Sequence, residues 1–320
     1  FFQSMNEKDE SVLNSNWIVS SRGKKNDIDF RKPYACLVEK ECTVHKKIED
    51  TAIIFLSNKE CSFKCLMCDL WKNTSDNSVS PGDIPAQIEW ALERLPTAKH
   101  LKLYNSGSFF DERAIPEVDY ERIAALIKNF ETVIVESHPK LINDKCLRFR
   151  DMLQHELEIA IGLETVNEDV LLKLNKQMTL ENFSNSVDFL LQNEIRSRAF
   201  ILLRPPFMSE SEGVYWAKQS IDFAFKVGVA CCTVIPVRAG NGAMDQLMKN
   251  GNFSLPNINS LETVLEYGLE LNAGRVFADV WDLELFSNCE KCITERTNRL
   301  TEMNLSQKIE NKVSCSCDSI

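Results

Sequence analysis

Three cysteines on one short stretch are the residues of this chain best suited to do chemistry. Cys61, Cys65 and Cys68 form a C-x3-C-x2-C cluster directly after an apolar run at residues 52–56. Thiolates are soft anionic ligands, and three on one loop suit an iron–sulfur cube with one iron free of protein ligands. A small molecule can chelate such an iron and accept an electron from the cluster. The spacing therefore predicts a [4Fe-4S] cluster with an open iron.

A zinc knuckle or a set of buried thiols is the alternative for these cysteines. Structural zinc normally takes four ligands, and no fourth cysteine or histidine lies nearby in the sequence. The iron–sulfur interpretation is therefore favoured. A non-enzymatic protein that binds zinc or an iron–sulfur cluster, with a structural or sensing role, remains the alternative of a different class.

Length and composition limit the remaining possibilities. The 320 residues suffice for one large α/β domain plus an appendage, and the net charge of −10 argues against a large nucleic-acid footprint. No apolar run is long enough to span a membrane, and residues 1–5 resemble a tag remnant. Twelve cysteines without an export signal indicate metal or redox chemistry rather than disulfides. We expect a cytoplasmic protein without a membrane partner.

The elements that must position the cysteines alternate between strand and helix. The pattern predicts strands at 51–57, 100–104, 132–136, 157–163, 198–203, 230–236 and 275–281. Helices are expected from about residue 80, and at 120–130, 144–154, 168–174, 180–193, 212–227 and 261–271. This alternation predicts an α/β fold with a parallel sheet, closed or partly closed into a (β/α) barrel, with a doubly wound sheet as the alternative. The cysteine loop then follows the first strand, where barrels place their chemistry.

Three regions are expected along the chain: an N-terminal extension at 6–50, the barrel at 51–283, and a cysteine-rich segment at 284–320. The extension includes a possible short edge strand at 34–38. The last segment contains two cysteine pairs around a charged, helical stretch at 295–308. Four thiolates in two pairs can complete a zinc site or hold a second iron–sulfur cluster, and either would tie down a tail with little core of its own. The pairs are Cys289 with Cys292, and Cys315 with Cys317.

The cysteine motif after the first strand resembles that of the radical SAM superfamily. The resemblance implies a partial or full (β/α) barrel, a cluster whose open iron is chelated by S-adenosylmethionine, and an electron donor such as flavodoxin or ferredoxin. Reductive cleavage of S-adenosylmethionine would give a 5′-deoxyadenosyl radical that abstracts hydrogen from a substrate. Members often carry C-terminal auxiliary clusters, so the resemblance favours a second iron–sulfur cluster at the four C-terminal cysteines over zinc.

Further blocks look most like the radical SAM subunit of archaeosine synthase and the catalytic subunit of Elongator. These blocks lie at 104–109, 135–139, 161–165, 174–176 and 202–207. Both relatives act on tRNA. In them an arginine commonly follows the Glu-Ser pair, whereas this chain has His138, which implies a different substrate-facing part.

The resemblance also implies which residues contact the cofactor. Met67 occupies a position that is usually aromatic and packs beside adenine, and Ile235 is expected at the adenine edge. The segment after the second strand would receive the methionyl ammonium, and carboxylates at the ends of later strands would bond ribose or methionine groups. Arg204 would pair with a carboxylate of the cofactor or substrate, or would cap nearby carbonyls. The expected contacts are therefore Met67, Asn105, Ser106, Gly107, Ser108, Glu136, Glu164, Arg204 and Ile235.

The function expected from the sequence is hydrogen abstraction from a small-molecule or carrier-bound substrate. The auxiliary cluster would serve as a sulfur donor or an electron acceptor, so sulfur insertion, lyase and dehydrogenation reactions all stay open. A tRNA-nucleoside-modifying enzyme similar to archaeosine synthase is the second possibility. The acidic composition favours the first.

Overall fold

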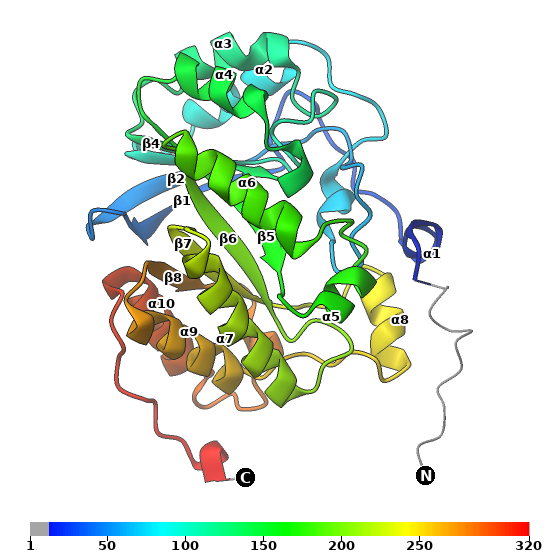
Figure 1. The fold of residues 1–320 in the computed structure, drawn as a ribbon, viewed down its shortest axis with the longest axis vertical. Helices are drawn as coiled ribbons and strands as arrows, with labels where there is room; N and C mark the ends of the chain where they lie inside the picture. Colours follow the sequence, from blue (N-terminus) through cyan, green and yellow to red (C-terminus); the bar gives the residue numbers. More distant parts are fainter. Residues whose placement is uncertain (1–12, 320) are drawn as a thin grey trace.

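Eight strands form a single curled sheet in the computed structural model, which describes residues 13–319 (Figure 1). The expected tag remnant at 1–5 lies outside the described residues. The strands lie side by side in chain order, so the doubly wound alternative is wrong and the partial barrel is confirmed. β1 runs antiparallel to β2, and every later neighbour is parallel. The strands are β1 (Ala35–Cys42), β2 (Ile48–Phe55), β3 (His100–Tyr104), β4 (Thr132–Ser137), β5 (Glu156–Glu164), β6 (Arg196–Leu203), β7 (Cys231–Pro236) and β8 (Arg275–Ala278).

Helices follow the strands as the periodicity predicts, and they cover the outer face of the sheet (Figure 1). Helix α7 packs on β5, β6 and β7, and α9 packs on β7 and β8. Among the described residues, none of the helices is long and apolar enough to cross a membrane. The helices are α1 (Ser15–Ser20), α2 (Asp83–Leu92), α3 (Tyr120–Leu126), α4 (Asp144–Met152), α5 (Glu168–Lys173), α6 (Leu180–Gln192), α7 (Glu210–Lys226), α8 (Ala243–Lys249), α9 (Ile258–Leu271) and α10 (Ile293–Ser306).

The N-terminal segment contributes more to the sheet than the sequence suggests. The expected edge strand at 34–38 is present as β1, but it extends to Cys42 and pairs along its whole length with β2. Its inward positions carry charges, Glu39 and Glu41, so the run lacks the apolar signal of a core strand. The sheet therefore begins ahead of residue 51. The sequence pattern also does not predict the short helices α1 and α8.

The two faces of the strands have different chemistry. In β3, Leu101 and Leu103 are fully buried in the hydrophobic core that the outer helices share. Lys102, between them in the sequence, points to the opposite face because side chains alternate along a strand. The same alternation directs Glu158 of β5 and Arg198 of β6 away from that core. The interior of the barrel is therefore charged where its outer layer is apolar.

These inward charges form one buried ion network across five strands. Arg198 donates to Glu158 at 2.8 Å and to Glu41 at 2.6 Å. Arg275 bonds the other oxygen of Glu158 at 2.8 Å, and Lys102 pairs with Glu41. Burial would raise the pKa of Glu41, but Arg198 and Lys102 more than offset it and hold the pKa below its usual range. The network stays ionised only because each charge meets its opposite.

The open side of the sheet is covered by α10. The side-chain amide of Asn304 accepts from the Ala278 N–H and donates to the Ala278 carbonyl, both at 2.8 Å. Gln307 makes the same pair of bonds with Val276, both at 2.9 Å. These amides satisfy backbone groups that an edge strand otherwise leaves unpaired. Helix α10 also contacts β1, so it lies over the seam between the first and last strands.

Replacing Arg198 with methionine should destabilise the protein by about 3–5 kcal/mol, because two buried carboxylates lose their shared cation. The midpoint of urea unfolding under reducing conditions measures the effect. Arg148→Met is the matched control, since Arg148 pairs with Glu117 on the surface and should contribute less than about 1 kcal/mol. Equal destabilisation by the two variants would contradict a structural role for the network.

Candidate functional site

The three-cysteine loop begins where β2 ends and is tied to the barrel by two asparagines. The amide of Asn175 donates to the Lys64 carbonyl at 2.7 Å. That of Asn241 donates to the carbonyls of Leu66 and Cys68 at 2.8 and 3.1 Å. Asn175 has a φ of 52°, a left-handed conformation that asparagine tolerates. The loop carrying the sulfurs is therefore fixed by side chains from distant parts of the chain.

The three thiols are half-buried and form one electrostatically coupled group. Burial raises the pKa of Cys68 to about 12 and also raises that of Cys65, and the neighbouring cysteine charges act in the same direction. Among the described residues, the sets of ligand atoms lying within 4.8 Å of one another do not include this trio. A single ion needs closely spaced ligands, whereas in a cube each thiolate binds a different iron. The arrangement is better suited to a cluster than to one ion.

A buried lysine supplies positive charge beside the thiols. Lys176 forms a buried ion pair with Glu164, and its charge acts on Cys61 and Cys65. Glu164 has a φ of 66°, and a Cβ on Gly162 would collide with both charged groups of the pair. Glycine at 162 thus leaves room for the pair. Glu164, expected to bond the cofactor, is engaged with Lys176, and its direct cofactor contact remains a prediction.

His138 links this lysine to the cysteine loop. Its Nε2 lies 2.9 Å from the Lys176 carbonyl, and its ring stacks on Phe63 at 3.6 Å between centroids. Burial, reinforced by the charge of Lys176, lowers the pKa of His138 to about 3. A neutral ring that donates from Nε2 and accepts the Lys140 N–H at Nδ1 satisfies both nitrogens. The histidine therefore supports the loop.

The segment after β3 lies beside the cysteine loop. A Cβ on Gly107 would approach that of Cys61 to 3.3 Å, so the two loops are in contact. Ser106 reaches the Tyr34 hydroxyl at 3.3 Å, and Ser108 accepts the His138 N–H at 2.7 Å. These two hydroxyls hold neighbouring parts of the protein together, and their expected role in cofactor binding stays a prediction.

Two polar residues at this end of the barrel, Asn105 and Glu136, are desolvated without full compensation from the described part of the protein. Both side-chain amide atoms of Asn105 are buried without a hydrogen bond. Glu136 accepts the Asn105 N–H at 2.6 Å and, more weakly, the Gly107 N–H at 3.4 Å. Burial raises the pKa of Glu136 to about 7, although these backbone bonds oppose it. A cationic ligand with polar groups would satisfy both residues, so the site fits the amino-acid end of S-adenosylmethionine.

Apolar residues complete the surroundings. Met67 and Ile235 pack in one hydrophobic cluster with Leu66 and Phe207, and their contact with adenine stays a prediction. Arg204 donates to Glu210 at 2.6 Å and to the Leu255 carbonyl at 2.7 Å, the second of the two roles considered for it. Its pairing with a cofactor carboxylate stays a prediction.

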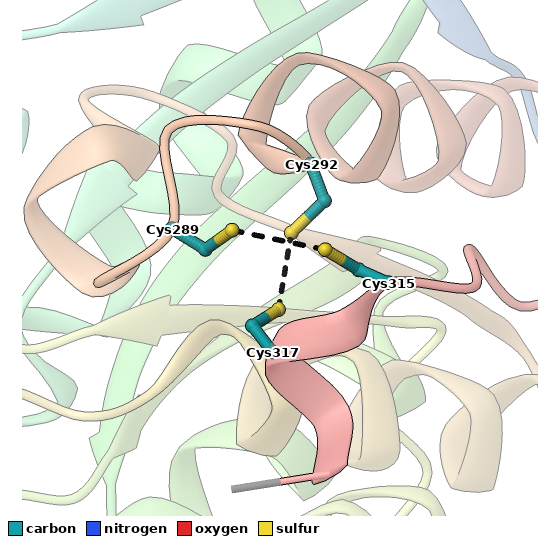
Figure 2. A group of neighbouring side chains, drawn as sticks. All are labelled: Cys289, Cys292, Cys315 and Cys317. Carbon is teal, nitrogen blue, oxygen red and sulfur yellow. Dashed lines mark hydrogen bonds between the residues drawn. The ribbon is translucent and has the colours of Figure 1, made fainter.

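The four C-terminal cysteines converge on a common point at the start of α10 (Figure 2). Their ligand atoms all lie within 4.8 Å of one another. The sequence therefore identified this cysteine group. It did not indicate the roles of Lys176, Asn241 and Tyr34, which depend on contacts between residues 12 to 175 positions apart. Lys176 lies in the block at 174–176 that resembles the relatives, but its ion pair with Glu164 follows from the fold.

No family model matches the chain. Archaeosine synthase subunit beta of Methanosarcina acetivorans is 24% identical over 284 residues, covering 79% of this chain and 77% of that protein. The protein of the same name from Thermococcus kodakarensis is 28% identical over 166 residues. The match covers 49% of this chain and 51% of that protein, so this chain spans about half of its length. A further relative is "Uncharacterized protein MJ0550" of Methanocaldococcus jannaschii, 26% identical over 93% of this chain and 88% of that protein.

Among solved structures, methylornithine synthase (PylB) superposes with a TM-score of 0.51 at 12% identity, covering 89% of this chain and 92% of that chain. Elp3 of Methanocaldococcus infernus gives a TM-score of 0.48 at 14% identity, over 62% of this chain and 51% of that chain. The first match extends over nearly the whole of both proteins, so it establishes the fold. The chain has the half-barrel fold of the radical SAM enzymes, and relatives named archaeosine synthase subunit beta are similar to it in sequence.

Proposed function

We propose that this chain is a radical SAM enzyme that abstracts hydrogen from a carbon of its substrate. When bound, the cluster and S-adenosylmethionine together would supply the 5′-deoxyadenosyl radical. The observation that carries the proposal is the position of the cysteine loop, beside the Asn105 amide, which has no hydrogen-bond partner among the described residues, and the desolvated Glu136 carboxyl. A structural metal site would have no need of such polar groups next to it.

Each residue of the site has a distinct role under this proposal. Cys61, Cys65 and Cys68 hold three irons, and Lys176 offsets part of their negative charge. Glu136 and Asn105 receive the ammonium and carboxylate of the methionyl group, while Ser106, Gly107 and Ser108 shape that subsite. Met67 and Ile235 cover the adenine. Glu164 keeps Lys176 in place through the ion pair.

The substrate belongs to one of two classes. Relatives named archaeosine synthase subunit beta favour a nucleoside in tRNA. The formal net charge of −10 favours a small molecule or a carrier-bound group, because RNA backbones require clustered cations. We favour the small-molecule class, with flavodoxin or ferredoxin as the electron donor. Stimulation of 5′-deoxyadenosine formation by total tRNA, abolished by ribonuclease, would instead select the nucleoside.

Anaerobically reconstituted protein should form 5′-deoxyadenosine and methionine from S-adenosylmethionine and dithionite, and Cys65→Ala should abolish both products. The reason is that two thiolates cannot hold the cube with its open iron in position. Product analysis by liquid chromatography measures the outcome. Cys36→Ala is the matched control, because Cys36 lies on β1 within the outer core and should leave product formation intact.

Persisting product in Cys65→Ala would contradict the assignment of the motif. Absence of product in the reconstituted native chain, with both candidate substrate classes added, would instead favour the non-enzymatic alternative.

Removing the buried cation should make the cluster harder to reduce. The double variant Lys176→Met with Glu164→Gln deletes both charges of the pair, so it leaves no unpaired buried charge. We expect this double variant to bind iron. The midpoint potential of its cluster should shift by about −60 mV from that of the native protein, which is a tenfold change in the equilibrium constant for one-electron reduction. A redox titration followed by electron paramagnetic resonance measures the shift.

Glu164→Gln alone is the control for the double variant. It keeps the ammonium and should move the potential in the opposite, positive direction. Potentials unchanged in both variants would contradict the electrostatic role of Lys176.

A further inference from the structure

Four sulfur atoms meet at one point where the C-terminal tail returns to the start of α10. Cys289 and Cys292 lie in the loop that leads into the helix, and Cys315 and Cys317 come from the tail (Figure 2). The Sγ atoms of Cys289 and Cys315 are 3.7 Å apart, and those of Cys292 and Cys317 are 3.6 Å apart. Cysteines separated by 26 and 25 positions in the sequence are thus brought together.

We propose that these four cysteines hold a single tetrahedral zinc ion, in place of the second iron–sulfur cluster that the resemblance favoured. Zinc–thiolate bonds of about 2.3 Å in a tetrahedron put the sulfurs about 3.8 Å apart. The Sγ separations of 3.6 and 3.7 Å match that edge. In a cube the thiolates bind separate irons and stand farther apart. Among the described residues, the trio in the barrel is not drawn together in this way, so the structure separates two kinds of cysteine site.

The contacts of α10 around the site show which segments such an ion would hold together. Arg299 of α10 is buried and donates to the carbonyls of Glu310 and Asn311, at 2.7 and 2.8 Å. The tail therefore runs back along the helix toward the cysteines. Arg299 also pairs with Glu266 of α9, and Arg296 with Glu262, both at 2.7 Å. Helix α10 is fastened to α9 on one side and to the tail on the other.

Because α10 covers the seam of the barrel, an ion at the start of this helix would affect the whole fold. Asn304 and Gln307 near the end of this helix pair with the edge of β8, and the metal would fix its beginning. Zinc has no redox chemistry, and four thiolates leave no open coordination position. The site is accordingly a structural clamp on the helix that covers the barrel seam, and it supplies neither sulfur nor electrons to the reaction.

Metal content distinguishes the clamp from a second cluster. Anaerobically reconstituted native protein should contain about four iron, four sulfide and one zinc per chain by elemental and sulfide analysis. The variant with Cys61, Cys65 and Cys68 all changed to alanine should lose the iron and keep the zinc. Eight iron and eight sulfide, or one extra iron without sulfide in place of zinc, would overturn the proposal. Neither result depends on S-adenosylmethionine cleavage, so the clamp can fail independently of the proposed function.

Loss of the ion should free the tail without unfolding the barrel. Cys317→Ser should lose zinc, retain four iron, and be cut by trypsin at Lys308 or Lys312 at least tenfold faster than the native protein. Ser316→Ala, between the two tail ligands, is the matched control and should behave as the native chain. Native protein treated with a zinc chelator should show the same new cleavage, which covers the case in which Cys317→Ser does not fold. Zinc retained in Cys317→Ser, or cleavage unchanged by the chelator after zinc has left, would overturn the clamp.

Discussion

Neutralising charge inside a low-dielectric barrel is the constraint on which the rest of this structure depends. Ionised groups lose hydration when they are buried, so each one requires an opposite charge or a ligand. At the end where the strands begin, Arg198 satisfies two carboxylates at once. At the end where the strands finish, the charge of Lys176 acts on Cys61, Cys65 and Glu136. The first end is satisfied by the protein alone, and the second is where the proposed cofactor would bind.

A second constraint comes from the open sheet. A half-barrel has two edge strands, and edges invite pairing with other chains unless they are covered. Here β8 is covered by side-chain amides of α10, and the Arg275 guanidinium bridges toward β1 through the Cys42 carbonyl at 3.3 Å. The cover is a single helix whose packing face is charged as well as apolar. Fixing its first turn with a metal would compensate for that limited hydrophobic contact.

The sequence predicts the elements whose signals are local. The strand at 100–104 and the helix at 261–271 follow from alternation and helical periodicity, and the cysteine spacings identify the C-terminal sulfur group. β1 was underestimated because its inward residues are charged, and the pairing of Arg198 with Glu41 spans 157 positions that no local pattern connects. The kind of metal centre at the four C-terminal cysteines likewise does not follow from the sequence, because spacing along the chain does not determine the distance between two sulfur atoms. The distance between the sulfur atoms distinguishes a single-ion site from a cluster site, and it is set only when the tail folds back onto the start of α10.

The incomplete satisfaction of Asn105 and Glu136 has a physical reason within the fold. Their backbones end neighbouring parallel strands, so their side chains meet at the edge where loops replace sheet hydrogen bonds. The Asn105 N–H already bonds Glu136, yet within residues 13–319 the Asn105 side-chain amide has no hydrogen-bond partner, and the carboxyl remains poorly solvated. A fold optimised only for stability would replace such a pair with apolar residues. The proposed binding of a cofactor beside the three thiols would explain why such a costly pair is kept.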